Sequence, residues 1–354
     1  MKTQVPTAEQ QIRFLQNLQR LLEDGQFVST YKFALLLSLA DLAVEKGDNS
    51  GETLTIDSRQ IAGKFIQYYW RQAIPYPSRG GPSRILQQNT GQQAAIINEA
   101  ISLRETFGGS YARATRNTSN WNSLITKIAG TIRLMPLWKL QVIGGHINDF
   151  LYENTGKGGK VTLKPGIPYC LRMFHGQINN MVRGAWIRWV RKTKANQSIL
   201  GQAADLGEFL FGSDRKPLTE LNPFLREQQN GQCFYCENSL DTKTEVDHFI
   251  PWIRYPLDLG HNFVLAHGSC NNSKRDHLAA VQHLEKWVLR NRENRETLEF
   301  YFNQKDISYD LEATERIAQW AYQQADNTGG DAWIEKGSEI QPLGNDWKNI
   351  LQVA

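Results

Sequence analysis

Three of the four cysteines lie close together in the chain and limit what this region can fold into. Cys233 and Cys236 are spaced Cys-x-x-Cys, and thirty-four residues later His267 and Cys270 repeat the spacing with one histidine. Two such pairs supply four ligands, the number that zinc takes in closed, structural sites. The spacing therefore predicts a Cys₃His zinc site, whose binding energy of about 10 kcal/mol in zinc-finger peptides would stabilise a small domain. The alternative is that His267 only begins a helix.

The remaining cysteine and the apolar segments indicate a protein of the cytoplasm. Cys170 follows Tyr169 and precedes Leu171, a context typical of a small core residue. The first ten residues are polar and lack the apolar core of a signal peptide. The longest apolar stretch, Phe33 to Val44, contains Asp41 and is shorter than the roughly 20 residues that cross a bilayer. We expect a cytoplasmic chain with no membrane partner.

Length and periodicity predict an α+β fold that is mostly α. The chain has 354 residues, which at about 150 per domain suggests two or three domains. Its 21% charged and 40% hydrophobic residues exclude global disorder. The composition and the periodicity predict a helical domain over 1–204, a smaller domain with the zinc pairs over 216–290, and a helical extension over 291–354.

Hydrophobic spacing places the helices, and one change of pattern suggests strands. A hairpin is expected between Asp149–Tyr152 and Lys160–Leu163, across a Gly-Lys-Gly-Gly turn at 156–159. The predicted helices are 32–44, one beginning after Asp57, one between Thr90 and Gly108, 120–134, 171–194, 205–211, one through Leu278 to Leu289, and 311–324.

Positive charge is concentrated in one block. Between Thr106 and Leu200 there are fourteen Lys and Arg residues but only two acids, so the block is net +12 and the rest of the chain net −8. Such a block suits nucleic acid. In the helix over 171–194, Arg183, Arg191 and Lys194 fall opposite the apolar stripe, which predicts contacts with phosphates. The alternative is an ordinary solvated helix.

A second set of polar residues is interleaved with the zinc pairs. Asp247 and His248 precede Pro251, Asn262 follows the histidine by fourteen residues, and Asn271 comes nine residues later. A neutral imidazole suits the base that activates water, and a carboxylate with an amide oxygen suits Mg²⁺ or Mn²⁺. This inventory is what hydrolysis of a phosphodiester requires.

The run from Gln232 to about Leu284 resembles the HNH endonucleases, in the zinc-containing branch of that superfamily. The resemblance implies a ββα-metal fold, with a strand near 244–249, a strand near 263–267 and a helix from about Ser269. It departs from many relatives at the His267-x-x-Cys270 pair, where they have two cysteines. The N-terminal two thirds resemble no family that we recognise.

Position by position, the resemblance implies a role for each residue. His248 is the implied general base, Asp247 and Asn271 are the implied ligands of a catalytic Mg²⁺ or Mn²⁺, and Asn262 shapes the loop that orients the base. Lys274 is an implied phosphate contact. One geometric tension remains, because neighbouring residues of a regular strand, here Asp247 and His248, point to opposite faces.

The resulting hypothesis is a metal-dependent HNH endonuclease that hydrolyses double-stranded DNA. By analogy it is a bacterial defence or restriction effector, with a second copy or a protein from a neighbouring gene as a further expected partner. The alternative is a zinc-stabilised nucleic-acid-binding module without catalysis.

Overall fold

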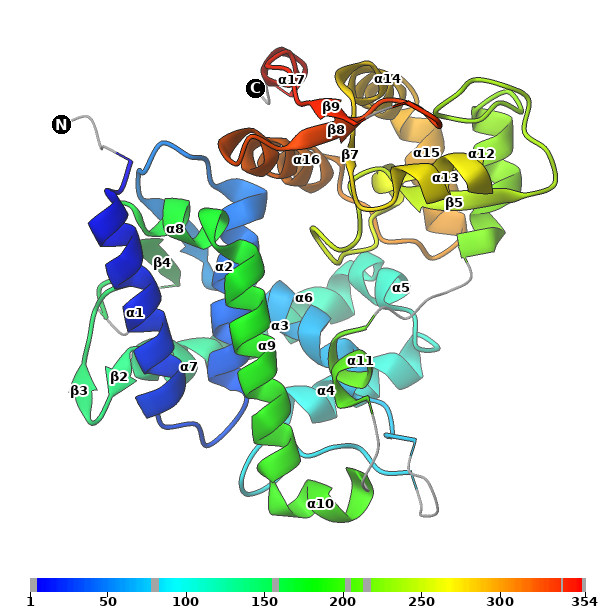
Figure 1. The fold of residues 1–354 in the computed structure, drawn as a ribbon. Helices are drawn as coiled ribbons and strands as arrows, with labels where there is room; N and C mark the ends of the chain where they lie inside the picture. Colours follow the sequence, from blue (N-terminus) through cyan, green and yellow to red (C-terminus); the bar gives the residue numbers. More distant parts are fainter. Residues whose placement is uncertain are drawn as a thin grey trace. The chain divides into compact units, whose positions relative to one another are not determined.

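The chain divides into two compact units, residues 1–212 and 213–354 (Figure 1). The computed structural model describes residues 5–77, 83–154, 159–200, 205–212, 218–338 and 340–351. Long helices and small sheets of two or three strands confirm an α+β fold that is mostly α. No helix among the described residues is both long enough and apolar enough to span a bilayer.

The first unit is a helical assembly around one nearly fully buried helix, α2. Twelve of the sixteen residues of α2 are buried, because its sequence is apolar on every side. It packs against α3, α7, α8 and α9. The helices of this unit are α1 (Ala8–Asp24), α2 (Tyr31–Lys46), α3 (Ser58–Gln72), α4 (Ala95–Thr106), α5 (Tyr111–Arg116), α6 (Thr118–Leu134), α7 (Pro136–Lys139), α8 (Ile167–Met173), α9 (His175–Lys192), α10 (Lys194–Leu200) and α11 (Leu206–Phe211).

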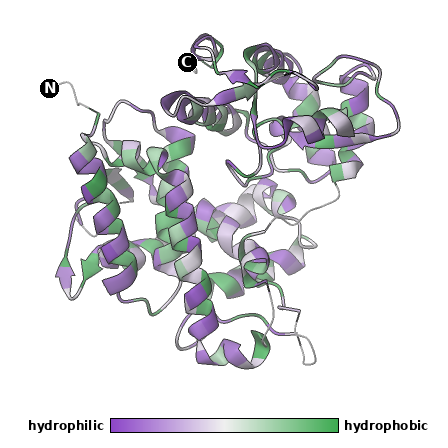
Figure 2. Cartoon of the chain, in the orientation of Figure 1, coloured by the Kyte–Doolittle hydropathy of each residue, from purple (hydrophilic) through white to green (hydrophobic). Residues whose placement is uncertain are grey.

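Side-chain caps begin several helices of this unit, among them α3 and α11. The Asp57 side chain accepts from the backbone N–H of Arg59, and Gln60 bonds back to the backbone of Asp57 in a capping box. Asp205 caps α11 in the same way, through the N–H of Glu208. Figure 2 shows hydrophilic and hydrophobic residues mixed around α1 and α9, as expected of helices with one face on a core.

The hairpin expected between 149–152 and 160–163 is largely wrong, because the main partner of residues 160–163 is another strand. Strand β4 (Lys160–Leu163) pairs antiparallel with β1 (Leu54–Asp57), more than a hundred residues earlier. Residues 149–152 contribute only one bridge, Tyr152 to Leu163. The pairing joins Ile56 to Val161 on a buried face, and a local pattern carries no information about so distant a partner. Residues 156–158 of the expected turn lie outside the described residues.

A short hairpin that the sequence analysis missed lies just upstream. Strands β2 (Val142–Ile143) and β3 (His146–Ile147) are joined by Gly144 and Gly145, both at positive φ (57° and 85°). Two central residues at positive φ are the requirement of a tight hairpin turn, and glycine meets it without strain.

The long helix expected over 171–194 is interrupted twice. Helix α8 ends at Met173, α9 runs from His175 to Lys192, and α10 begins at Lys194. The fully buried Arg172 donates to the carbonyls of Ala43 and Val44 at the end of α2. These bonds fix α8 at the end of α2, while α9 packs along α2, so the helix axis changes direction between them.

The second unit contains a strand pair followed directly by a helix. Strands β5 (Thr244–His248) and β6 (Phe263–His267) are antiparallel, with Thr244 opposite His267 and His248 opposite Phe263. Helix α13 (Gly268–Lys274) follows β6 without a loop. The strand, strand, helix order expected for this segment is therefore confirmed. The unit also contains η1 (Leu218–Leu221), α12 (Asn222–Gln228) and η2 (Gly260–Asn262).

The segment after residue 290 falls within the second compact unit, residues 213–354. The backbone carbonyl of His261 accepts hydrogen bonds from Trp287, Arg290 and Asn291. Strand β7 pairs in parallel with β8, about fifty residues later. The elements are β7 (Leu278–Ala279), α14 (Val281–Glu293), α15 (Arg295–Gln304), α16 (Leu311–Asn327), β8 (Asp331–Trp333), β9 (Gln341–Pro342) and α17 (Trp347–Ile350). Leu278, expected within a helix, lies in β7.

A buried polar network joins three helices of the first unit. Asp41 of α2 accepts from Tyr68 Oη at 2.5 Å and lies 2.9 Å from His175 Nε2, while Lys64 pairs with Glu45 nearby. Burial alone would raise the pKa of Asp41, but the hydrogen bond with His175 and the charge of Lys64 outweigh it and lower that pKa.

Replacing Asp41 with asparagine should destabilise the chain at neutral pH. Loss of one charged partner from a buried network costs about 3 kcal/mol in unfolding free energy. A folded-state pKa below the unfolded value means that the stabilisation is present above the unfolded pKa, about 4, and is lost as the pH falls through the folded pKa. Urea unfolding at neutral and acid pH measures both effects. Asp24→Asn, at an exposed position of α1, is the control. Equal stability of Asp41→Asn and wild type at neutral pH would contradict the network's role.

Candidate metal centre and adjoining polar site

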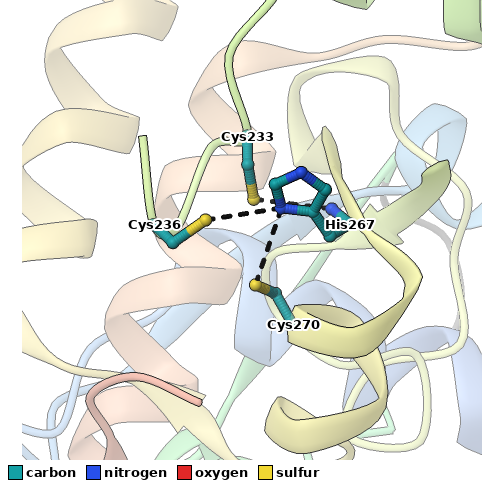
Figure 3. Close-up of side chains that lie close together, drawn as sticks. All are labelled: Cys233, Cys236, His267 and Cys270. Carbon is teal, nitrogen blue, oxygen red and sulfur yellow. Dashed lines mark hydrogen bonds between the residues drawn. The ribbon is translucent and has the colours of Figure 1, made fainter. Parts of the chain in front are cut away.

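Four side chains from three elements converge at the start of the second unit (Figure 3). Cys233 and Cys236 lie in the turn after α12, His267 ends β6, and Cys270 lies in the first turn of α13. Their ligand atoms all lie within 4.8 Å of one another, and no other group of three or more His, Cys, Asp or Glu residues among the described residues has metal-ligand geometry. The expected Cys₃His cluster is therefore present, and it can hold a metal ion such as zinc.

The two cysteines of the first pair are set by a tight backbone turn. The N–H of Cys233 donates to the carbonyl of Asn238 at 2.9 Å, and the N–H of Glu237 donates back to Cys233 at 3.0 Å. Glu237 takes a positive φ of 60°, which closes the turn. Both thiols thereby reach the same side as the β6–α13 junction.

The histidine is oriented as a metal ligand. Its Nε2 lies 3.1 Å from the carbonyl oxygen of Ser239, which only accepts, so Nε2 carries the hydrogen and Nδ1 keeps its lone pair. Nδ1 lies 3.4 Å from Cys236 Sγ and 4.0 Å from Cys270 Sγ. Ligands around a tetrahedral zinc stand roughly 3.5 Å apart when Zn–S is about 2.3 Å and Zn–N about 2.0 Å. The spacing therefore fits a tetrahedral ion.

The thiols lie in an environment that a cation would suit. Burial alone would raise the pKa of Cys233, but backbone N–H groups of Cys236, His267 and Tyr235 lower it. Burial and the neighbouring thiols raise the pKa of Cys270 to about 12. A bound divalent ion favours the thiolate form at every ligand.

Asp247 and His248 lie on a regular part of β5 and point to opposite faces. Asp247 pairs with Val264 and His248 with Phe263 in the ladder. The strand is therefore regular at this point, and the two neighbouring side chains lie on opposite faces, each in a separate environment.

The carboxylate of Asp247 is largely buried and has two close donors. Tyr235 Oη donates to its Oδ2 at 2.5 Å, and Lys274 Nζ lies 3.0 Å from the same oxygen. Tyr235 sits between the two cysteines of the first pair, so the turn that carries two cluster ligands also donates a hydrogen bond to this carboxylate. Sequence reasoning missed Tyr235, although its place between the ligands was visible.

Lys274 does not lie where a phosphate contact was expected. Its side chain is fully buried, and Nζ also donates to the backbone carbonyl of His248 at 3.1 Å. The correction has a simple cause: α13 lies against β5, and a lysine in its last turn reaches the partly buried Asp247 before it reaches solvent.

Asn262 binds the loop after β5 with both ends of its amide. Its Oδ1 accepts from the N–H of Ile250 at 2.8 Å, and its Nδ2 donates to the carbonyl of Ile250 at 2.9 Å. This two-point contact holds the chain two residues after His248. It has the form expected of a loop-shaping residue, and its influence on the base stays a prediction.

The structure brings Asn271 to Glu245 instead of Asp247. Asn271 Nδ2 donates to Glu245 Oε2 at 2.7 Å near the surface. Glu245 and Asp247 lie two residues apart on β5 and so share one face of the strand. Glu245 was not singled out in the sequence, because no spacing rule marks it.

His248 has a partner that sequence reasoning also missed. Its Nε2 lies 2.7 Å from Asp258 Oδ1, and its ring meets Phe263 edge to face at 5.0 Å. Asp258 lies in the loop between the strands, where no motif marks it. Both side chains are partly exposed, at 16% for His248 and 34% for Asp258.

The expected basic face is only partly as predicted. Arg191, at the end of α9, and Lys194, at the start of α10, are exposed, together with Arg188 and Lys192. Arg183 is half-buried, with its guanidinium 5.1 Å from the ring of Phe211. Arg183 therefore packs against α11 and does not join the other cations in solvent.

Comparisons with known proteins bear on the first unit only. A family model described as "Domain of unknown function (DUF8808)" matches residues 11–206, more than half of the chain. No curated protein and no solved structure matches the chain. The matched region ends before the Cys₃His cluster.

The purified protein should contain one equivalent of zinc. We expect Cys236→Ser or His267→Ala to lose it, because three ligands hold the ion far more weakly than four. Metal analysis by mass spectrometry, after dialysis against a mild chelator, measures the content. Cys170→Ala removes the buried cysteine outside the cluster and should retain the metal. A wild-type protein that is fully folded without metal would contradict a structural role.

Proposed function

The chain belongs to the family described as a domain of unknown function (DUF8808), and from residues beyond the matched region we propose that it is a metal-dependent endonuclease acting on DNA. One observation carries the proposal. A metal-binding cluster joins a strand pair to a short helix, and the same strand and helix carry Asp247, His248 and Asn271. The cluster holds zinc in a structural role under this proposal.

His248 acts as the general base. A base must reach solvent, where its water lies, and the ring is partly exposed at the end of β5. The loop after it is held by Asn262, which limits how far the ring can move relative to the strand. The base removes a proton from water that attacks the phosphorus.

The remaining polar residues fit a hard divalent cation. Tyr235 and Lys274 both contact Oδ2 of Asp247. The other carboxylate oxygen, Oδ1, is the atom that would coordinate a cation. Asn271 bonds to Glu245 through Nδ2, so its amide oxygen stays a ligand of the type that Mg²⁺ and Mn²⁺ prefer. Such an ion, when bound, stabilises the charge that develops on the leaving oxygen.

Lys274 lowers the net negative charge at the proposed cation ligands, Asp247 and Asn271. Its ammonium partly neutralises Asp247, which weakens cation binding when no substrate is present. The oxygen of a DNA phosphate adds the further negative charge that a divalent ion needs. Metal and substrate should therefore bind cooperatively.

Exposed cations of the first unit suit the substrate. Arg188, Arg191, Lys192 and Lys194 lie within seven residues, with no acidic residue among them. Contacts of this kind supply affinity for the duplex backbone without reading sequence. Each site cuts one strand, so a double-strand break requires a second copy or a second encounter.

A second candidate function is nucleic-acid binding without catalysis. The observation that favours it is the Lys274 to Asp247 ion pair, which occupies one oxygen of the expected metal ligand. A supercoiled plasmid incubated with Mg²⁺, Mn²⁺ or EDTA separates the two functions. Binding without nicking under every metal supports the binding module.

His248→Ala should abolish nicking and leave DNA binding intact. Loss of a general base costs roughly 10²- to 10⁴-fold in rate. Initial nicking rates on supercoiled plasmid measure the effect, and a gel-shift assay measures binding. His277→Ala, in the same unit, is the matched control. Full-rate cutting by His248→Ala would exclude this assignment of the base.

Removal of two exposed cations should weaken DNA binding in a salt-dependent way. In the Arg191→Ala, Lys194→Ala double variant, the plot of log affinity against log salt should be less steep by about 2, because each phosphate contact contributes about 0.9 to its steepness. Fluorescence anisotropy across a salt series measures the slope. The control is the Arg13→Ala, Arg20→Ala double variant, which removes the same charge from α1. Each of these arginines already pairs with an acidic residue. Equal slopes for both pairs would argue against a specific interface.

A further inference from the structure

The partner of His248 lies in a segment that no motif marks. Asp258 Oδ1 is 2.7 Å from His248 Nε2. A carboxylate only accepts hydrogen bonds, so Nε2 carries the hydrogen, and in the neutral form of the ring the lone pair is on Nδ1. We propose that Asp258 is a positioning residue that holds the His248 ring in this tautomer and directs Nδ1 to the water; the proposal rests on the function proposed above.

The ring is held from a second direction. Phe263, directly opposite His248 in the ladder, meets the ring edge to face at 5.0 Å. A ring held by packing on one side and by a hydrogen bond at one nitrogen has little rotational freedom. The nitrogen that does not contact the carboxylate, Nδ1, is then the one that acts as the base.

The loop that carries Asp258 is anchored to the C-terminal helices. Two residues after Asp258, the N–H of Gly260 donates to the carbonyl of Ser308 at 2.9 Å. A side chain at residue 260 would lie 2.6 Å from the ring of Phe302 on α15, so only glycine allows this approach. Earlier in the loop, Tyr255 contacts Trp320 of α16, with ring centroids 6.0 Å apart.

These anchors give the carboxylate a fixed position. Asp258 lies between two points at which the loop touches α15 and α16, and Asn262 closes the loop against the end of β5. The aspartate therefore meets His248 without needing a bound ligand to order it. Asp258 is a positioning residue because it acts through His248 and not on the substrate.

The test compares the tautomer of His248 with the nicking rate. Nitrogen-15 NMR of the labelled full-length protein at about pH 8, where a histidine is mostly neutral, reports which ring nitrogen carries hydrogen. The His248→Ala spectrum assigns the signal. The expected wild-type state is Nε2–H. Asp258→Ala should give a mixture, and Asp258→Asn should move hydrogen to Nδ1 wherever its amide donates to Nε2.

The nicking rate should follow the Nε2–H fraction. We expect a loss of about 10- to 100-fold in kcat for Asp258→Ala, with plasmid binding unchanged. Asp276→Asn removes an exposed carboxylate of the same unit and should change neither readout.

Three outcomes decide the proposal. A wild-type ring with hydrogen on Nδ1, or an Asp258→Ala variant whose tautomer matches wild type, overturns the role of Asp258. Full-rate nicking by Asp258→Ala overturns it as well. A wild-type protein that never nicks but shows Nε2–H, lost in Asp258→Ala, refutes the nuclease function and supports the orientation of His248 by Asp258.

Discussion

A cluster of three thiols and one imidazole connects the parts of the second unit that carry its polar site. The four ligands come from a turn, the end of a strand and the first turn of a helix, three elements too short to be stable alone. A bound ion joins them at one point. Tyr235, between two of the ligands, then reaches Asp247, and the helix that carries Cys270 also carries Lys274. Two contacts of Asp247 thus come from the segments that carry the cluster ligands.

The polar site itself is divided by the strand that carries it. Asp247 belongs to a buried side, with a phenol and an ammonium as partners, while His248 belongs to a partly exposed side, with a carboxylate as partner. Lys274 lies on the buried side, where Nζ contacts the Asp247 carboxylate and the backbone carbonyl of His248.

The sequence predicted what depends on local spacing and missed what depends on distant partners. Cys233, Cys236, His267 and Cys270 could be found because metal geometry imposes a spacing, and α3 and α11 because their caps are local. The pairing of β4 with β1 and of β7 with β8 joins segments far apart, which periodicity does not report. Asp258 and the burial of Lys274 were missed for the same reason, since both follow from tertiary packing.

The parallel pairing of β7 with β8, and the approach of Gly260 to Phe302, have a consequence for how the chain is made. During synthesis the cysteine ligands leave the ribosome well before residues 302 to 333. The loop beside His248 packs against Phe302, and strand β7 pairs with β8, so both depend on these later residues. The metal can be captured early, yet the surroundings of His248 assemble only when the later helices emerge. A growing chain therefore completes its set of four metal ligands before the residues around His248 are all in place.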